Sequence, residues 1–260
     1  MVLKRRVALG GVQLDGVDDR ILITGIDEAA GKDTISAVSL GGISGQRITN
    51  RRRDTLDITV KFAMKIRNND MAARSTLLDK VNAWAKPGGW LTVGHRSGKW
   101  IHVVLAQAPG GGDQYDWAND YTIVFRAYEV PFWEDVTATT AVMTTDDSGT
   151  GSITMDCSAD TVADVTVTNA SGSSIDTVSV MIGSRTMSFT SLGLANGSSL
   201  VIDHVHADGI YAVRARIGET SVMSKKTGAD ELILTPGVNA ISWTAGGDVA
   251  VTVSAKGRYL

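Results

Sequence analysis

The chain has little of what stabilises secreted proteins or anchors membrane proteins. Its 260 residues contain a single cysteine, Cys157, which excludes an internal disulfide and a cysteine-based zinc cluster. This usage fits assembly in a reducing cytoplasm. No run of about 18 apolar residues is present, so we expect no membrane span. The basic start of the sequence is followed by too short an apolar run for a signal peptide.

Sequence signatures of catalysis and cofactor binding are also missing. The sequence has no G-x-S-x-G, Cys157 has no local signature of a nucleophile, and adjacent carboxylates lie in turn-like surroundings. The glycine-rich stretch Pro109–Gly112 lacks the Gly-Lys-Ser/Thr of a phosphate-binding loop. We therefore expect neither enzyme activity nor a cofactor.

Two short segments contain residue types that bind metals. His204 and His206 are two residues apart in D-H-V-H, which places them on one side of a strand, but a third ligand is missing. Asp15, Asp18 and Asp19 have the composition of a calcium loop without the spacing or the closing Glu of an EF-hand. The first segment is interpreted as polar surface and the second as a turn, so we expect no metal site.

Charge and tryptophan are distributed unevenly along the chain. Up to Trp133 there are 18 Lys and Arg against 14 Asp and Glu, whereas from Glu134 on there are 7 against 14. Five of the six tryptophans lie in the first part. Glycine is frequent and proline scarce, which favours a β-rich chain with tight turns. The composition predicts two domains, residues 1–133 and 134–260.

The first domain is predicted to be α+β and mostly antiparallel, a split barrel or sandwich with one helix. Residues 54–66 alternate apolar and polar side chains at period two, which indicates a strand with one face on a core. A helix is predicted over 71–85, after an N-cap region at Asn69–Asp70 and before Pro87-Gly88-Gly89. Further strands are expected at residues 4–9, 20–26, 34–40, 46–53, 90–93 and 99–106.

The stretch N-D-Y-T-I-V-F-R-A-Y-E-V-P-F-W, residues 119–133, is predicted to close the first domain. Its aromatic and β-branched residues alternate as in a mostly buried strand. Pro131 ends this strand because proline cannot donate to the ladder. Phe132 and Trp133 follow as an apolar plug. We predict that Pro131, Phe132 and Trp133 form the domain junction, with Trp133 packed there.

The second domain is predicted to be an antiparallel β-sandwich, because about eight short apolar segments alternate with turn residues. Residues 134–152 are rich in Thr, Asp, Ser and Gly and are assigned no strand. Gly246-Gly247 is interpreted as a break between two strands. The expected strands are residues 165–168, 177–182, 186–189, 200–203, 210–214, 231–234, 240–243 and 249–255.

A basic run, Arg47 with Arg51, Arg52 and Arg53, precedes the strand at 54–66. We expect residues 46–53 to form a long, exposed hairpin with that strand. Nucleic-acid binding calls for a broad basic field, and the pI of about 5.8 argues against one. The hairpin is either solvated or paired with a neighbouring chain, since exposed strand edges invite strand addition.

Seven segments in a fixed order carry a resemblance to a known family. They are T-L-D-I-T-V-K-F, L-L-D-K-V-N-A-W, W-L-T-V and Y-T-I-V-F-R-A-Y-E-V-P-F-W in the first domain, then V-T-V-T-N-A-S, L-V-I-D and E-L-I-L-T-P-G-V-N-A-I-S-W in the second. Together with the single helix, this order resembles the distal tail (Dit) proteins of long-tailed bacteriophages and prophages. The resemblance covers nearly the whole chain.

The resemblance implies a structural protein of the virion tail that is assembled in the bacterial cytoplasm. The first domain would close into a homo-hexameric ring at the distal end of the tail tube, with DNA passing through its channel. The second domain would be a galectin-like sandwich where baseplate, tail-tip and receptor-binding proteins attach. Galectin sugar chemistry does not carry over, because Trp243 belongs to a strand. The tail tube protein is a further implied partner.

The ring implied by the resemblance requires a subunit interface. We predict that it uses the polar face of strand 54–66 and the basic hairpin. Its candidate residues are Arg47, Arg51, Arg52, Arg53, Asp57 and Lys61. Two alternative functions stay open: a carbohydrate-binding module or adhesin that contacts the host surface, and a tail-tube or tube-completion protein.

Overall fold

The computed structural model describes residues 5–29, 31, 33–39, 46–66, 70–110, 121–207 and 210–260. The chain divides into two compact units, Met1–Trp133 (unit 1) and Glu134–Leu260 (unit 2). The pairs that build the sheets of both units are antiparallel, and the described residues contain one α-helix. The predicted mainly β, antiparallel fold is therefore confirmed. Within these ranges, no helix has the length and apolar character needed to cross a membrane.

Unit 1 is built on a sheet with the strand order β2-β1-β7-β8-β9-β6-β3. Strand β6 (Leu56–Met64) pairs with β3 on one side and with β9 on the other. Its alternate side chains are buried, as the period-two pattern predicted. The other strands are β1 (Val7–Leu9), β2 (Val12–Gln13), β3 (Ile21–Glu28), β7 (Gly89–Val93), β8 (Lys99–Gly110) and β9 (Tyr121–Ala127), with a 3-10 turn at Leu14–Gly16.

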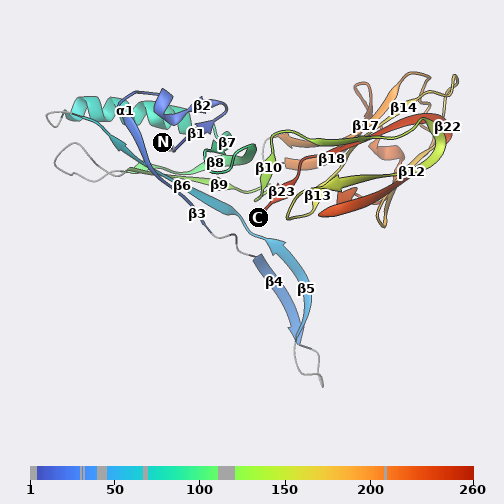
Figure 1. Ribbon diagram of the computed structural model, residues 1–260, viewed down its shortest axis with the longest axis horizontal. Helices are drawn as coiled ribbons and strands as arrows, with labels where there is room; N and C mark the ends of the chain where they lie inside the picture. The colour runs from blue at the N-terminus through green and yellow to red at the C-terminus, as the bar shows by residue number, and fades with distance from the viewer. Residues whose placement is uncertain are drawn as a thin grey trace. The chain divides into compact units, whose positions relative to one another are not determined.

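Helix α1 (Met71–Ala85) packs on one face of this sheet (Figure 1). The Asp70 carboxylate caps it by accepting a hydrogen bond from the Ala73 N–H at 3.0 Å. Leu77, Val81 and Ala85 are buried, and the Trp84 ring meets Phe125 of β9 edge to face at 5.9 Å. The helix predicted over 71–85 is confirmed.

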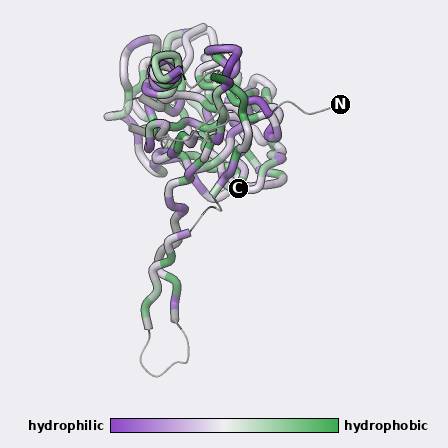
Figure 2. Tube along the Cα trace, turned by 90° about the vertical axis from the view of Figure 1, so that its left-hand side faces the viewer, coloured by the Kyte–Doolittle hydropathy of each residue, from purple (hydrophilic) through white to green (hydrophobic). Residues whose placement is uncertain are grey.

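Strands β4 (Asp33–Ser39) and β5 (Gln46–Arg53) form a separate two-stranded sheet. Asp33 lies opposite Arg53 and Ser39 opposite Gln46, with a bulge beside Ser36 and Ala37. Figures 1 and 2 show this hairpin extending away from the sheet of unit 1. The predicted pairing of residues 46–53 with strand 54–66 is wrong. Strand β6 has neighbours on both edges, so it has no free edge for β5.

Unit 2 is a two-layer β-sandwich in which the long strand β22 (Gly237–Ala255) belongs to both layers. One layer has the order β12-β22-β15-β16-β20, and the other contains β11, β22, β14, β17, β18 and β19. The main strands are β11 (Thr139–Val142), β12 (Asp146–Met155), β14 (Asp164–Asn169), β15 (Val178–Ile182), β16 (Arg185–Phe189), β17 (Ser199–Ala207) and β18 (Ile210–Ile217). The short ones are β13 (Thr161–Val162), β19 (Thr220–Ser221), β20 (Lys226–Gly228) and β21 (Ile233–Leu234), with a 3-10 turn at Met223–Lys225. Strand β10 (Trp133–Asp135) begins at the last residue of unit 1 and pairs with β23 (Arg258–Tyr259), outside the sandwich sheet.

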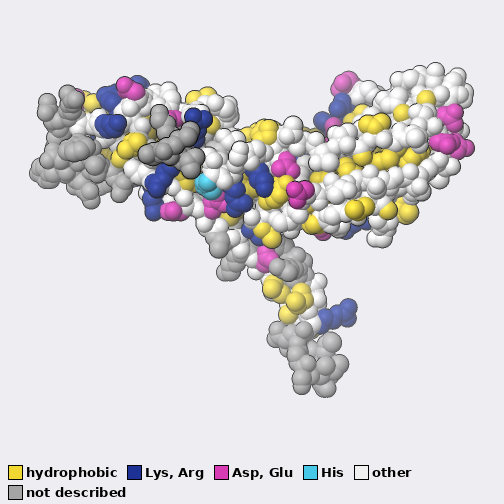
Figure 3. Space-filling view, in the orientation of Figure 1, with side chains coloured by type: hydrophobic (Ala, Val, Ile, Leu, Met, Phe, Trp, Pro, Cys, Tyr) yellow, Lys and Arg dark blue, Asp and Glu magenta, His cyan; other side chains and the backbone are white. Residues whose placement is uncertain are grey.

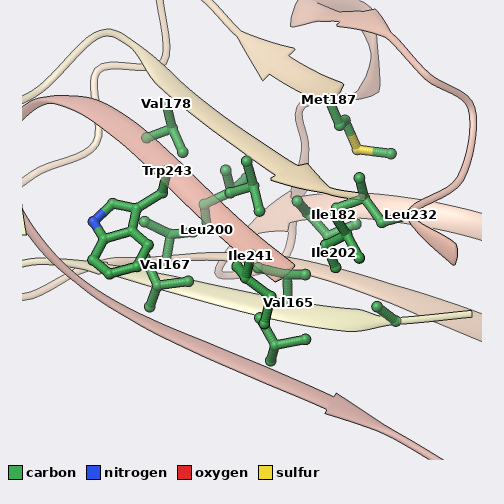
Figure 4. Close-up of a cluster of buried hydrophobic side chains, with 14 of the residues drawn as sticks. Val165, Val167, Val178, Ile182, Met187, Leu200, Ile202, Leu232, Ile241 and Trp243 are labelled. Atoms are coloured by element: carbon green, nitrogen blue, oxygen red, sulfur yellow. The ribbon is translucent and has the colours of Figure 1, made fainter. Parts of the chain in front are cut away.

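The core of unit 2 lies between these two layers. Trp243 and Ile241 of β22 point towards Val167 of β14 and Leu200 of β17 (Figure 4). Trp243 is 2% exposed, so its expected place in the core is confirmed. Because the inward residues are apolar, this packing accounts for the apolar segments found in the sequence.

Three strand expectations in unit 2 are corrected. Residues 134–152 were assigned no strand, but they contain β11 and most of β12. Gly246-Gly247 does not break a strand, because β22 continues through it. A Cβ at Gly247 would lie 2.8 Å from the Ser171 Cβ, so glycine here permits a close approach rather than a turn. The strand expected over 231–234 covers only Ile233–Leu234.

Candidate assembly surfaces

The β4–β5 hairpin exposes large apolar side chains. Ile35, Val38 and Ile48 are 53%, 50% and 59% exposed. Ile48 lies opposite Ala37, and by strand alternation Ile35 is on the same face, while Val38 is on the other. A two-stranded hairpin is marginally stable alone in water. Its apolar faces are consistent with a surface that another chain covers on assembly.

The predicted basic residues of the hairpin have different surroundings. Arg47 is exposed and lies opposite Val38. The Arg53 side chain is only 12% exposed, and its guanidinium lies 5.3 Å above the Phe132 ring and 3.9 Å from the Asp33 carboxylate. Arg53 therefore contributes to packing within unit 1. The backbones of Arg51 and Arg52 are paired with β4, but their side chains lie outside the described residues.

Asp57 and Lys61 lie on the face of the sheet opposite the core and form ion pairs with adjacent strands. The Asp57 carboxylate accepts two hydrogen bonds from Arg126 of β9, at 2.5 and 2.6 Å. These bonds raise the pKa of Arg126 above its ordinary value. The Lys61 ammonium is 2.7 Å from the Asp27 carboxylate of β3. This face, which we call the open face, therefore carries a row of ion pairs across three strands, and its role in an interface stays a prediction.

Aromatic side chains extend the open face over β7 and β8. The Trp90 ring stacks on Trp100 at 4.4 Å and meets His102 edge to face at 5.2 Å. Trp90 lies opposite His102, whereas the alternate pair Leu91 and Ile101 is buried in the core. This cluster was not predicted from the sequence, although the alternation of these aromatic residues with aliphatic ones is visible there.

Trp133, the last predicted junction residue, is buried in unit 1. Its side chain is 0% exposed, and its Nε1–H donates to Glu28 Oε2 at 3.2 Å. Glu28 also binds Arg96 at 2.8 Å and His95 at 2.5 Å, and the Arg96 guanidinium lies 5.6 Å above the Trp133 ring. Burial alone would raise the pKa of Glu28, but these hydrogen bonds outweigh it and keep the pKa below its usual value. No local pattern predicts these contacts of Trp133 with Glu28 and Arg96, which are distant in the chain. Of the other junction residues, Pro131 is buried and Phe132 half-buried.

The residue that follows, Glu134, is anchored in unit 2. Its carboxylate lies 3.0 Å from the Arg258 guanidinium, and both side chains are buried. The Tyr259 hydroxyl lies 3.0 Å from the Asp135 carboxylate and 2.5 Å from the Asp156 carbonyl, and its one hydrogen can be donated to either oxygen. Burial raises the pKa of Tyr259 to about 12. Arg258 and Tyr259 are therefore bound to Glu134 and Asp135, the first residues of unit 2.

The candidate metal residues have other partners. Among the described residues, no group of three His, Cys, Asp or Glu side chains is arranged to hold an ion. His204 Nδ1 is 2.8 Å from the Asp164 carboxylate, and the side chain of His206 lies outside the described part of the chain. Asp18 binds Arg20 and Lys80, and the hydrogen bond from Arg20, followed by that from Lys80, holds its pKa well below the ordinary value.

Known proteins resemble this chain in structure. No protein-family model and no curated protein matches the sequence. The crystal structure of the SPP1 Dit (gp 19.1) protein aligns with 97% of this chain and 98% of its own, with a TM-score of 0.69 and 12% identity. This chain has the fold of SPP1 Dit. SPP1 Dit is described as a paradigm of the hub adsorption apparatus in phages that infect Gram-positive bacteria. At the level of the fold, the resemblance to distal tail proteins is confirmed.

Two other solved structures match less closely. The phage P2 baseplate in its activated conformation with Ca has a TM-score of 0.46 and 10% identity, covering 99% of this chain and 98% of that chain. The phage p2 baseplate with Sr has a TM-score of 0.45 and 10% identity, covering 97% of both. Because these scores are low, the fold assignment depends on SPP1 Dit.

Proposed function

We propose that this chain is a structural component of a bacteriophage tail tip. Six copies form a ring at the distal end of the tail tube, and the ring is the hub to which baseplate, tail-tip and receptor-binding proteins attach. DNA passes through its channel. The observation that carries the proposal is the structural alignment with SPP1 Dit, which extends over nearly the full length of both chains.

The β4–β5 hairpin is the proposed contact between subunits of the ring. It lies outside the main sheet of unit 1, and it exposes Ile35, Val38 and Ile48. An isoleucine that is half exposed in one chain loses water contact when a neighbouring chain covers it, which favours assembly. The exposed Arg47 on this hairpin can select an acidic surface on the neighbour.

The open face of unit 1 is a second candidate for contacts in the ring stack. Asp57 and Lys61 are paired within the unit, so they add little affinity but can set register between copies. Trp90 and Trp100 offer aromatic area at the other end of the face. Half-exposed aromatic residues of this kind are enriched at protein interfaces.

The structure offers less support for the two alternatives. For the adhesin, Trp243, the single tryptophan after Trp133, is buried in the core of unit 2, so it is not available to stack on a sugar ring. A tail-tube role leaves unit 2 without a function, although it makes up nearly half of the chain.

Electron microscopy of the purified full-length chain tests the proposal. Six-fold rings with an open centre are expected in the class averages. Isolated monomers at every protein concentration, together with specific binding on a glycan array, would favour the adhesin instead.

A further inference from the structure

Strand β12 of unit 2 is long and has one edge without a partner strand among the described residues. Strand β12 (Asp146–Met155) is ten residues long and, among the described residues, pairs with a single strand, β22. The sandwich's other edge strands, β11, β19 and β20, are four, two and three residues long. Within the described part of the chain, strand β18 pairs with β19 only at Arg216 and Ile217, which leaves a shorter free edge over residues 210–215. The free backbone groups of β12 are therefore the largest strand template that this unit presents.

Beyond its start, where Asp146, Asp147 and a bulge lie, the edge of β12 lacks the usual protection against strand addition. Residues 150–155, T-G-S-I-T-M, contain neither proline nor a charged residue. Thr150, Ser152 and Thr154 are exposed, while Ile153 and Met155 alternate with them and are buried in the core. The core therefore fixes one face of β12, whereas the edge away from β22 has no partner strand among the described residues.

The surroundings of β12 are uncharged except at its start. Val238 of β22, opposite Thr154, is 73% exposed. Strand β12 is drawn in yellow-green in Figure 1, and the same face of unit 2 in Figure 3 shows uncharged and apolar side chains, with charged ones towards its margins. Asp146 and Asp147 at the start of the strand are exposed and, within the described residues, form no ion pair.

We propose that β12 accepts an extended segment of a partner protein as an additional antiparallel strand. The segment recognised would be uncharged and rich in Val and Thr over its length, because it lies along Thr150 to Met155. At its C-terminal end it would carry Lys or Arg, because an antiparallel strand places that end beside Asp146 and Asp147. Main-chain hydrogen bonds supply affinity in this mode of recognition, and flanking side chains supply specificity.

This inference rests on the proposed hub function, for which it specifies how unit 2 attaches a partner. The two can fail separately, because ring formation by unit 1 and strand addition to unit 2 are measured in different experiments. A chain that forms rings without binding a strand would refute only this inference. A monomeric chain that binds a strand would refute only the ring.

The test uses a synthetic peptide, acetyl-Val-Thr-Val-Thr-Val-Thr-Lys-Lys-amide, and the full-length chain. Amide hydrogen exchange of residues 148–155 should slow when the peptide is added, with no comparable change in β19 or β20. The matched peptide with alternate backbone amides N-methylated keeps every side chain but loses the donors of one edge. It should bind at least about tenfold more weakly, because several main-chain hydrogen bonds are lost.

Two matched charge variants separate the role of the acidic end from a general effect of charge. Asp147→Asn should weaken binding about two- to fivefold, as expected for an exposed charge pair. Glu219→Gln removes one exposed charge at the opposite edge of the unit and should leave binding unchanged. Equal binding of the N-methylated peptide, or unchanged exchange in residues 148–155, would overturn the inference.

Discussion

Replacing Ile35 and Ile48 with alanine should weaken ring assembly while leaving the individual chain folded. Both side chains lie on one face of the β4–β5 hairpin. They are 53% and 59% exposed, so each has about half of its surface still to bury. The double variant removes most of that apolar surface and introduces no charge, which isolates the hydrophobic contribution of the hairpin.

The size of the effect follows from the exposed fractions. Burying a whole isoleucine side chain is worth about 1.5–3 kcal/mol, so half a side chain is worth roughly 1 kcal/mol. The two residues together should contribute about 2 kcal/mol to each contact between subunits. This corresponds to a roughly thirtyfold weaker contact. The stability of the isolated chain should change by less than about 0.5 kcal/mol per substitution, because both positions are on the surface.

Sedimentation velocity over a concentration series measures the effect on assembly, and urea unfolding measures the stability of the chain. Val142→Ala is the matched control, because Val142 is 74% exposed but lies in unit 2. It should change neither result. If the double variant assembled at the same concentration as the parent chain, the hairpin would not be the subunit contact. A loss of chain stability of 2 kcal/mol or more would show that the two residues act in folding instead.

Three further predictions concern the folding of the two units. Trp133→Phe should lower the free energy of unfolding by about 1–2 kcal/mol in urea titrations, because the hydrogen bond to Glu28 is lost in a buried site; an unchanged value would contradict the anchor. Asp18→Asn should lower the Tm at pH 7, because a lowered carboxylate pKa adds stability above the ordinary value of 3.8 that is lost as the pH falls through the folded pKa. The difference in Tm should therefore narrow below pH 3.8, and a constant difference would refute the assignment. Gly149→Ala would place a Cβ 2.4 Å from the Trp243 ring and should cost about 1–3 kcal/mol by chemical unfolding, whereas a neutral result would show that the ring can move aside.

Local patterns in the sequence predicted the elements whose side chains are themselves sorted by burial. Strand β6 alternates because one face meets the core, and α1 has a cap at Asp70 and an apolar stripe. The patterns failed where a residue type is required by a contact with a part of the chain that is distant in sequence. Gly149 and Gly247 look like turn residues, yet Trp243 and Ser171 occupy the space that a Cβ would fill. For this reason β12 resembled a linker and β22 resembled two strands.

Pairing between strands could not be predicted from local patterns either. The segments 33–39 and 46–53 pair with each other because β3 and β9 occupy both edges of β6, and that arrangement depends on the whole sheet. The anchor of Trp133 joins Glu28 to a residue 105 positions later in the sequence. The exposed apolar residues of the hairpin became recognisable as a candidate surface only once the hairpin was seen to stand outside the sheet.

The mass of the assembled particle tests the central claim most directly. Multi-angle light scattering of the full-length chain should give a species of roughly 165 kDa, six times the chain mass of 27.5 kDa. A mass of 27.5 kDa that persists at every concentration would contradict the account of a ring-forming tail hub.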